Sequence, residues 1–440
     1  MTQPDSLPIE GLPVARATLP LVYGTGLEYS PPARGTWTIM HLGLLIPETH
    51  IIFVCARCCL RGVSMSAAEL RALDRFSTIT IEDCNLLEGN TEHVLIEGVT
   101  DILSHLPRRP KGVFIFTSCV HEFIGSDLTF SFETLRRRFP DIVFTDGYMT
   151  PILRKRITPD QRNRRQIYTM LNPAQARDDG VTLAGEVRPV KEHSDYRRLV
   201  ENARRPWRQI TQTRTWREYQ DLARSGTVLT LSPFAAPARR WMSEHLGQTP
   251  LALSTPWTWD EIRCEKAKLC TALGVPPLED DAPLEDAARH ALHEVRRALS
   301  NAPLAIDYTA TTRPLSLARL LLAEGFNVRR LYVDAVAPNE KADFEWLQVH
   351  QPQLMLHPTV SAVMVGKRPA ADQRVLALGQ KAAWFEHTDR FVNMVEGDGA
   401  DGLRGILRLA ERMNDAWQHP KSARDVIQIK ALGCTKGGCA

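Results

Sequence analysis

The chain has 440 residues, of which 43% are hydrophobic and 24% are charged, and its net charge is +3. These ordinary proportions exclude a disordered or collagen-like chain, and the small net charge gives no overall attraction to nucleic acid. No apolar run approaches the ~20 residues of a membrane span, and the first residues show no secretory signal. We therefore expect a soluble, cytoplasmic chain of about three domains, with no nucleic-acid or membrane partner.

Short apolar runs that end in polar or glycine residues alternate with amphipathic segments along the chain. The predicted strands cover residues 50–55, 111–117, 141–145, 226–231, 304–307 and 328–333. The predicted helices cover residues 94–106, 238–246, 259–273, 315–324 and 403–413. Continuous apolar strands of this kind are typical of parallel sheets covered on both faces. The predicted fold class is therefore α/β, with three Rossmann-like domains whose parallel sheets are covered by helices.

Two polar segments mark the expected junctions between these domains. Residues 153–225 are rich in arginine, glutamine and aspartate, and they predict a surface excursion and connector. The acidic, proline-containing stretch at 276–283 is the second junction. The resulting domains are 1–190, 191–290 and 291–420, followed by a cysteine- and glycine-rich tail at 421–440.

The chain contains nine cysteines, and they are unevenly distributed. Five of them lie in the first part of the sequence, at Cys55, Cys58, Cys59, Cys84 and Cys119. Cytosolic thiols stay reduced, so a disulfide framework is not expected. The clustering favours ligation of a metal or cluster, and burial as small apolar residues is the alternative.

Two groups of these cysteines follow predicted strands. Cys55, Cys58 and Cys59 lie at the end of the first strand, and Cys119 follows the second strand at the start of a helix. The carboxyl ends of parallel strands open into a crevice at one edge of the sheet, and a helix start favours the thiolate that binds iron. We expect the two groups to converge on one inorganic cluster. The alternative is a set of buried thiols in which the adjacent pair points apart.

Residues 50–130 resemble the N-terminal domain of the nitrogenase component 1 superfamily. The matching pieces are the cysteines after the first strand, the stretch IEDCNLLEG at 81–89 and the stretch FTSCVHEFIGSDL at 116–128. The last is the most specific, because it resembles the family's TTCxxExIGDD. By this likeness Cys59 takes the second ligand position and Cys119 the third. The resemblance implies a cluster-binding N-terminal domain that holds an iron–sulfur cluster, P-cluster-like or 4Fe-4S, bridging to a partner subunit.

The first ligand position departs from the family pattern. Where the family has a cysteine, this sequence reads YSPPARG and places Ser30. Either Ser30 contributes an oxygen, or Cys55 or Cys58 compensates, or the cluster has a smaller ligand set; Cys84 is a further substitute. The ligand candidates rank in the order Cys59 and Cys119, then Cys55, then Cys84 and Cys58.

The resemblance extends weakly to the second domain, over residues 230–264. In the catalytic subunit of nitrogenase, a cofactor-ligating cysteine follows a strand there, and a cofactor-ligating histidine precedes the C-terminal helix. Here residues 232–234 read SPF and residues 395–402 read VEGDGADG, so neither ligand is present. We expect the nearby His387 to be solvated or hydrogen-bonded rather than a ligand. The chain therefore resembles the β-type, electron-relaying subunit.

The remaining cysteines give weaker signals. Cys264 and Cys270 are six residues apart on a predicted helix, do not share a face and are expected in the core. Cys434 and Cys439 lie on a glycine-rich tail that is expected to be mobile, with a metal or partner role as the alternative. The arginine-rich stretches lack interleaved aromatic residues and are expected to form solvated surface or a subunit contact.

The resemblance implies an oxidoreductase subunit that works in a complex. It would take electrons from a separate ATP-dependent iron protein and assemble with an α-type component 1 partner subunit as an α2β2 heterotetramer. Reductive cleavage of the C–S bond of methylthio-alkanes is the first expectation for the reaction, and reduction of a tetrapyrrole of the protochlorophyllide or chlorin type is the second. A scaffold for metal-cofactor assembly, which turns over no substrate, is the alternative from another class.

Overall fold

The computed structural model of the chain describes residues 11–21, 29, 39–150, 158–276, 281–365 and 374–426. The chain divides into two compact units. Unit one takes residues 1–36, 190–203 and 255–440, and unit two takes residues 37–189 and 204–254. In the part of the chain that is described, no helix has the length and apolar character needed to cross a membrane.

The first sheet of unit two carries the sequence that resembles the cluster-binding domain. It has four parallel strands in the order β3-β2-β4-β5. These strands are β2 (Thr49–Ala56), β3 (Phe76–Ile81), β4 (Gly112–Thr117) and β5 (Val143–Tyr148). The helices of this region are α1 (Ile39–Leu44), α2 (Arg57–Glu69), α3 (Asp83–Glu88), α4 (Thr91–His105), α5 (Cys119–Ile124) and α6 (Leu128–Arg138).

Both faces of this sheet are covered, which is why its central strands read as continuous apolar runs. On one face, alternate residues such as Ile52 and Ile115 join a core formed with α4 and α6. On the other face, Phe53 and Phe116 stack with ring centroids 4.6 Å apart. A Cβ on Gly147 of β5 would lie 2.5 Å from the Phe116 ring, so the neighbouring strand needs glycine there.

The second sheet of unit two corrects the prediction for residues 153–225. Instead of a surface excursion, this segment supplies one central strand and one edge strand, β6 and β7, of a four-stranded parallel sheet in the order β7-β6-β8-β9. The strands are β6 (Asp178–Leu183), β7 (Trp207–Gln209), β8 (Ser225–Thr230) and β9 (Thr249–Ala252). The helices are α7 (Pro159–Gln166), α9 (Trp216–Gln220) and α10 (Ala236–Leu246).

Helix α7 is partly buried although its sequence is polar. The side chain of Arg164 is only 2% exposed, because its guanidinium donates to the carbonyl oxygen of Gly185 and to the carboxylate of Asp160. A buried arginine whose donors are satisfied costs little, so an arginine-rich helix can lie inside a protein.

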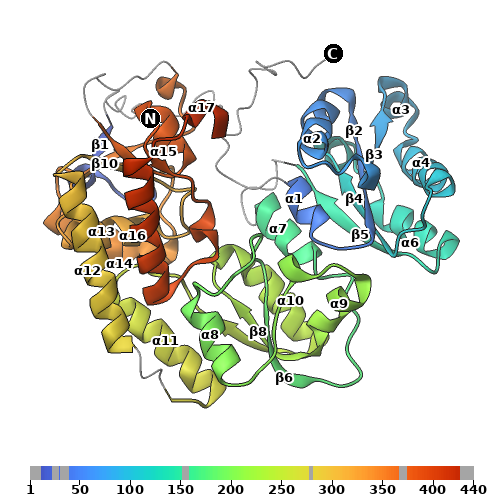
Figure 1. Cartoon of the computed structure of the whole chain (residues 1–440). Helices are drawn as coiled ribbons and strands as arrows, with labels where there is room; N and C mark the ends of the chain where they lie inside the picture. The colour runs from blue at the N-terminus through green and yellow to red at the C-terminus, as the bar shows by residue number, and fades with distance from the viewer. Residues whose placement is uncertain are drawn as a thin grey trace. The chain divides into compact units, whose positions relative to one another are not determined.

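Unit one contains a six-stranded sheet in the order β1-β12-β11-β10-β13-β14. All neighbouring strands are parallel except the β1–β12 pair. The strands are β1 (Leu12–Pro13), β10 (Leu304–Asp307), β11 (Val328–Tyr332), β12 (Met355–His357), β13 (Leu376–Leu378) and β14 (Phe391–Val392). The helices are α8 (Asp195–Asn202), α11 (Trp259–Leu273), α12 (Asp281–Leu299), α13 (Pro314–Ala323), α14 (Lys341–His350), α15 (Gln380–Glu386), α16 (Gly402–Gln418) and α17 (Ala423–Val426). Helices α12 and α16 pack side by side (Figure 1).

The α/β class with parallel sheets flanked by helices is confirmed. The strand predicted at 304–307 has those bounds, and those predicted at 50–55, 111–117 and 226–231 agree within about two residues. The strand predicted at 141–145 instead covers Val143–Tyr148. The division into domains ending near 190, 290 and 420 stays a prediction.

Candidate functional site

Two neighbouring strands of the first sheet of unit two deliver cysteines to the same edge. Strand β2 ends at Ala56, and α2 begins at the next residue, so Cys58 and Cys59 lie in the first turn of that helix. Strand β4 ends at Thr117, and Cys119 is the first residue of α5. The strands are paired in parallel, so both connections emerge at the carboxyl edge of the sheet.

The thiols at this edge lie within electrostatic reach of one another. The Sγ atoms of Cys58 and Cys59 are 3.9 Å apart. Burial and the thiols of Cys59, Cys58 and Cys119 raise the pKa of Cys55 to about 12. Burial, a hydrogen bond with Cys58 and the charge of Cys119 raise the pKa of Cys59 as well. The structure therefore brings together Cys55, Cys58, Cys59 and Cys119, which the sequence analysis expected to converge.

The four thiols differ in their exposure to solvent. Cys58 is exposed, and Cys59 and Cys119 are partly buried at the edge. Cys55 is fully buried and packs in the apolar core beside Phe53. The first three are therefore reachable by a ligand from outside the sheet, whereas Cys55 lies beneath them.

Cys84 stands apart from this group in its interactions. It lies on the first turn of α3, after β3, and is exposed. The charges that raise the pKa of Cys55 and of Cys59 come from the other three thiols and not from Cys84. Its helix is fixed by a hydrogen bond from the Glu82 backbone N–H to the side-chain oxygen of Asn85, at 2.9 Å.

Two buried polar atoms beside Cys119 were not anticipated from the sequence. The hydroxyl of Ser118 and Nε2 of His121 are buried and have no hydrogen-bond partner among the described residues. Such atoms are rare in folded proteins, because an unpaired buried polar group costs about 1–3 kcal/mol. The only signal in the sequence is the position of both residues within two of a predicted ligand.

The donor set fits an iron–sulfur cluster better than a single metal ion. Within the described ranges, no three His, Cys, Asp or Glu side chains are placed to hold one ion. Iron–sulfur clusters are held by cysteine thiolates, and this edge brings four thiols together. The cysteines of this chain are also grouped more loosely than a closed single-ion site requires.

The helices that carry the outer cysteines also expose large apolar side chains. Leu87 on α3 is 89% exposed, and Phe123 on α5 is 74% exposed. Ile124, next to Phe123, is exposed as well. These exposed apolar side chains lie on helices that follow strands of the same sheet as the cysteines.

The other sequence candidates do not join this group. His387 is exposed in the left-handed cap of α15, as expected for a solvated histidine. Cys270 is buried as predicted, but the prediction for Cys264 is wrong, because its thiol is exposed on another face of α11. Three further candidates lie outside the described residues: Ser30, Cys434 and Cys439.

Comparison with known proteins identifies the family. A family model described as nitrogenase component 1 type oxidoreductase matches residues 42–362. The chain belongs to this family. Among curated proteins, no sequence matches significantly. The predicted relationship is thus confirmed, and the family consists of oxidoreductases that bind iron–sulfur clusters and form complexes with partner subunits and an iron protein.

Solved nitrogenase structures share the fold. The structure titled "Nitrogenase Cp1 at pH 6.5" is similar with a TM-score of 0.65 and 12% identity, covering 90% of this chain and 95% of that chain. The structure titled "Nitrogenase Cp1 at pH 5" is similar with a TM-score of 0.58 and 10% identity, covering 93% of this chain and 92% of that chain. At these identities the likeness concerns the fold alone.

Proposed function

We propose that the chain is the electron-relaying, β-type subunit of a nitrogenase-like reductase. It accepts electrons from an ATP-dependent iron protein through an iron–sulfur cluster at the interface with its partner. The reaction proposed for the complex is reductive cleavage of the C–S bond of methylthio-alkanes, in which two electrons and two protons convert R–S–CH3 into R–H and methanethiol. The observation that carries the proposal is the convergence of four thiols at one sheet edge.

Each cysteine at this edge has a distinct proposed part in holding the cluster. Cys59 and Cys119 are the first ligands, because they are partly buried at the edge and come from paired strands. Cys58, whose sulfur lies 3.9 Å from that of Cys59, is within reach of the same cluster. Cys55 and Cys84 remain substitutes for the missing first cysteine; Cys55 requires a side-chain movement out of the core, and Cys84 requires an approach from α3.

The chain's own residues would position the cluster and shield it. When bound, the cluster supplies one-electron transfer at a potential set by burial and by hydrogen bonds to its sulfur atoms. Strands β2 and β4 fix the two ligand-bearing turns through their parallel pairing. The buried hydroxyl of Ser118 is an unused donor next to Cys119, and it is available for a hydrogen bond to a sulfur atom.

The proposed α-type partner would complete the site. Three outer thiols on one chain give an incomplete ligand set for a larger cluster, and exposed Leu87 and Phe123 border the same edge. A partner that covers these side chains would remove apolar surface from water and exclude solvent from the cluster. An α2β2 heterotetramer is the assembly that we propose.

The test is anaerobic co-purification of the chain with its natural partner, followed by iron and sulfide counting and EPR of the reduced complex. We expect several irons per αβ pair, and loss of most iron and of the visible absorption in the Cys59→Ala and Cys119→Ala variants. Cys264→Ala is the matched control, since this exposed thiol lies in unit one. Iron content that is unchanged in both ligand variants would refute the assignment.

Turnover separates the proposed reductase from its rivals. The complex, supplied with the iron protein and ATP, should release methanethiol from a methylthio-alkane. ATP-dependent reduction of a chlorin would favour the tetrapyrrole reductase. An iron-loaded complex that transfers its metal cofactor to an acceptor protein and reduces neither compound would favour the assembly scaffold.

A further inference from the structure

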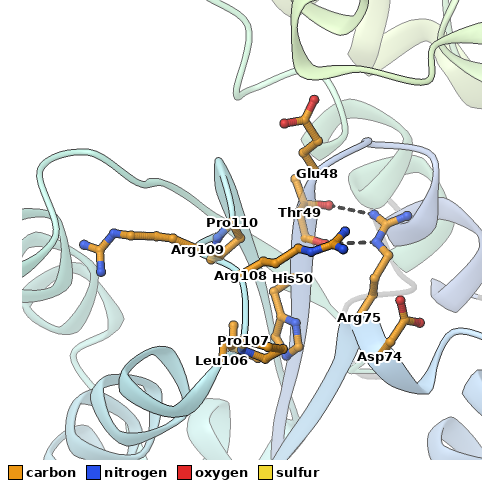
Figure 2. A pocket seen from close by; sticks show the side chains of 10 residues that line it. All are labelled: Glu48, Thr49, His50, Asp74, Arg75, Leu106, Pro107, Arg108, Arg109 and Pro110. Atoms are coloured by element: carbon orange, nitrogen blue, oxygen red, sulfur yellow. Dashed lines mark hydrogen bonds between the residues drawn. The ribbon is translucent and has the colours of Figure 1, made fainter.

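A cavity of about 740 Å³ lies at the amino-terminal edge of the first sheet of unit two, at the opposite strand ends from the cysteines (Figure 2). Its walls come from the turn into β2, the turn into β3 and the connection between α4 and β4. The lining residues are Glu48, Thr49, His50, Asp74, Arg75, Leu106, Pro107, Arg108, Arg109 and Pro110. Three of them are arginines, from two different connections.

Arg75 gives the cavity a fixed positive charge. Its guanidinium donates to the backbone oxygens of Leu44 (3.3 Å), Ile46 (2.6 Å) and Thr49 (3.0 Å), and to the Thr49 hydroxyl (3.0 Å). These acceptors orient the group but carry no formal charge. Burial lowers the pKa of Arg75, and the nearby Asp74 raises it, so the guanidinium stays charged in a partly desolvated place.

Arg108 brings a second and movable positive charge. Among the described residues, its guanidinium makes no hydrogen bond, ion pair or ring contact, and the side chain is exposed. In Figure 2 it extends from the connection between α4 and β4 toward β2, on the side where Arg75 lies. Arg109 points the other way and is committed to Asp141 through two hydrogen bonds of 2.5 and 2.7 Å.

The lining also contains two carboxylates, and both are exposed to solvent. Glu48 accepts the backbone N–H of Trp216 at 2.7 Å, and Asp74 comes from the turn into β3. His50 is buried and binds the Ser77 hydroxyl at 2.8 Å; burial and the charge of Arg75 lower its pKa to about 4, so it is neutral at neutral pH. The imidazole of His50 is therefore neutral, and Arg108 is the lining cation that makes no other polar contact among the described residues and can meet a ligand.

The remaining lining is apolar and rigid. Leu106, Pro107 and Pro110 form one side of the cavity, and prolines hold their backbone in a fixed shape. A cavity of 300–1,000 Å³ with an apolar wall and a few polar groups is typical of small-ligand sites. Guanidinium groups bind carboxylates and phosphates through paired hydrogen bonds, so the chemistry points to an anionic ligand.

We propose that this cavity binds a small organic oxyanion, in which a carboxylate or phosphate group sits on an apolar body. Arg108 donates to the oxyanion beside the fixed positive charge of Arg75, and Leu106 and the two prolines contact the apolar body. Because the cavity and the cysteines lie at opposite ends of the strands, this site is separate from the proposed cluster and does not rest on the proposed function.

Isothermal titration calorimetry on the purified full chain at low salt tests the proposal. Phenyl phosphate and benzoate are the probes, with inorganic phosphate and phenol as the two halves of the ligand. We expect saturable one-to-one binding of at least one probe, more than tenfold tighter than inorganic phosphate or phenol. The stronger of the two probes identifies the phosphate or the carboxylate as the preferred group.

Arg108→Gln should weaken this binding at least tenfold, because it removes the free guanidinium and leaves the Arg75 hydrogen bonds intact. Arg137→Gln on α6 is the matched control, since it removes another exposed arginine that does not line the cavity, and it should bind as the unchanged chain does. Absence of saturable binding, or equal affinity in Arg108→Gln and the unchanged chain, would overturn the proposal. Equal affinity for inorganic phosphate and phenyl phosphate would also overturn it, because the apolar wall would then take no part.

Discussion

The packing of Gly147 against Phe116 predicts that the substitution Gly147→Ala lowers the stability of the fold. A Cβ added to Gly147 would lie 2.5 Å from the Phe116 ring, whereas ordinary contacts begin near 3.4 Å. The ring cannot yield freely, because it stacks on Phe53 and Phe114 with centroids 4.6 and 4.4 Å away. In Gly147→Ala, either the strand β5 or this aromatic stack must therefore move.

The magnitude follows from two opposing effects. Overpacking of a filled core costs about 1–3 kcal/mol, and replacing a strand glycine by alanine returns about 0.5–1 kcal/mol. The expected net loss is centred on ~1 kcal/mol and is at most about 2.5 kcal/mol. For a folding unit of about 200 residues, each kcal/mol lowers Tm by about 2–4 °C, so Gly147→Ala should lower it by about 2–4 °C and by no more than about 10 °C.

Thermal unfolding followed by circular dichroism on the full chain would measure this shift. Gly62→Ala is the control, because that glycine lies in α2 with no heavy atom within 4 Å of the new Cβ. It should raise stability by about 0.5–1 kcal/mol. In the double variant Gly147→Ala/Phe116→Leu, the loss should be smaller than the sum of the single losses. A Tm for Gly147→Ala at or above that of the unchanged chain would refute the packing argument.

Two further predictions concern buried charges in unit one. Burial raises the pKa of Glu340 to about 8 from its ordinary 4.5, so the folded chain binds more protons than the unfolded chain between these values. Urea unfolding should therefore show the free energy of unfolding falling as pH rises from 5 to 8, by up to about 1.4 kcal/mol per pH unit. Glu340→Gln should flatten this slope. The same slope in Glu340→Gln and in the unchanged chain would contradict the prediction. Arg330 donates to the fully buried carboxylate of Glu386 at 2.5 and 2.8 Å, so Arg330→Met should cost about 3–5 kcal/mol in the same assay. The double variant Arg330→Met/Glu386→Leu should regain most of that loss, because it no longer leaves the Glu386 carboxylate buried without its cation. Equal losses in the single and double variants would show that this unpaired carboxylate is not the cause.

Much of the fold could be predicted because burial on both faces leaves a readable pattern. The strands at 50–55 and 304–307 are apolar except for one polar residue at an end of each, since all of their side chains are buried. Strand β6 begins with Asp178 and two further non-apolar residues, so only its second half carries that pattern. Strands β12, β13 and β14 have only two or three residues each, too few for any periodicity to show.

The candidate site was predictable where strand ends determine position. Cys59 and Cys119 come together because β2 and β4 are paired, and the sequence shows a cysteine at the end of each. Cys55 is buried and Cys264 is exposed because of how their elements pack in the tertiary structure. The local sequence around each cysteine carries no signal of that packing. The exposed Leu87 could not be recognised either, because an apolar residue on a short helix gives the same signal inside or outside a core.

The interleaving of the two units constrains how the chain can fold during synthesis. Helix α8 belongs to unit one, although it lies between two segments of unit two. Its Tyr196 is buried, and the Tyr196 backbone N–H donates to the carboxylate of Asp401, just ahead of α16. At about 5–20 residues per second, the ribosome supplies that partner some 10–40 s after α8 emerges. The apolar face of α8 therefore stays exposed until α11 and α16 have been made, and a fragment that stops at residue 254 would lack both of these contacts.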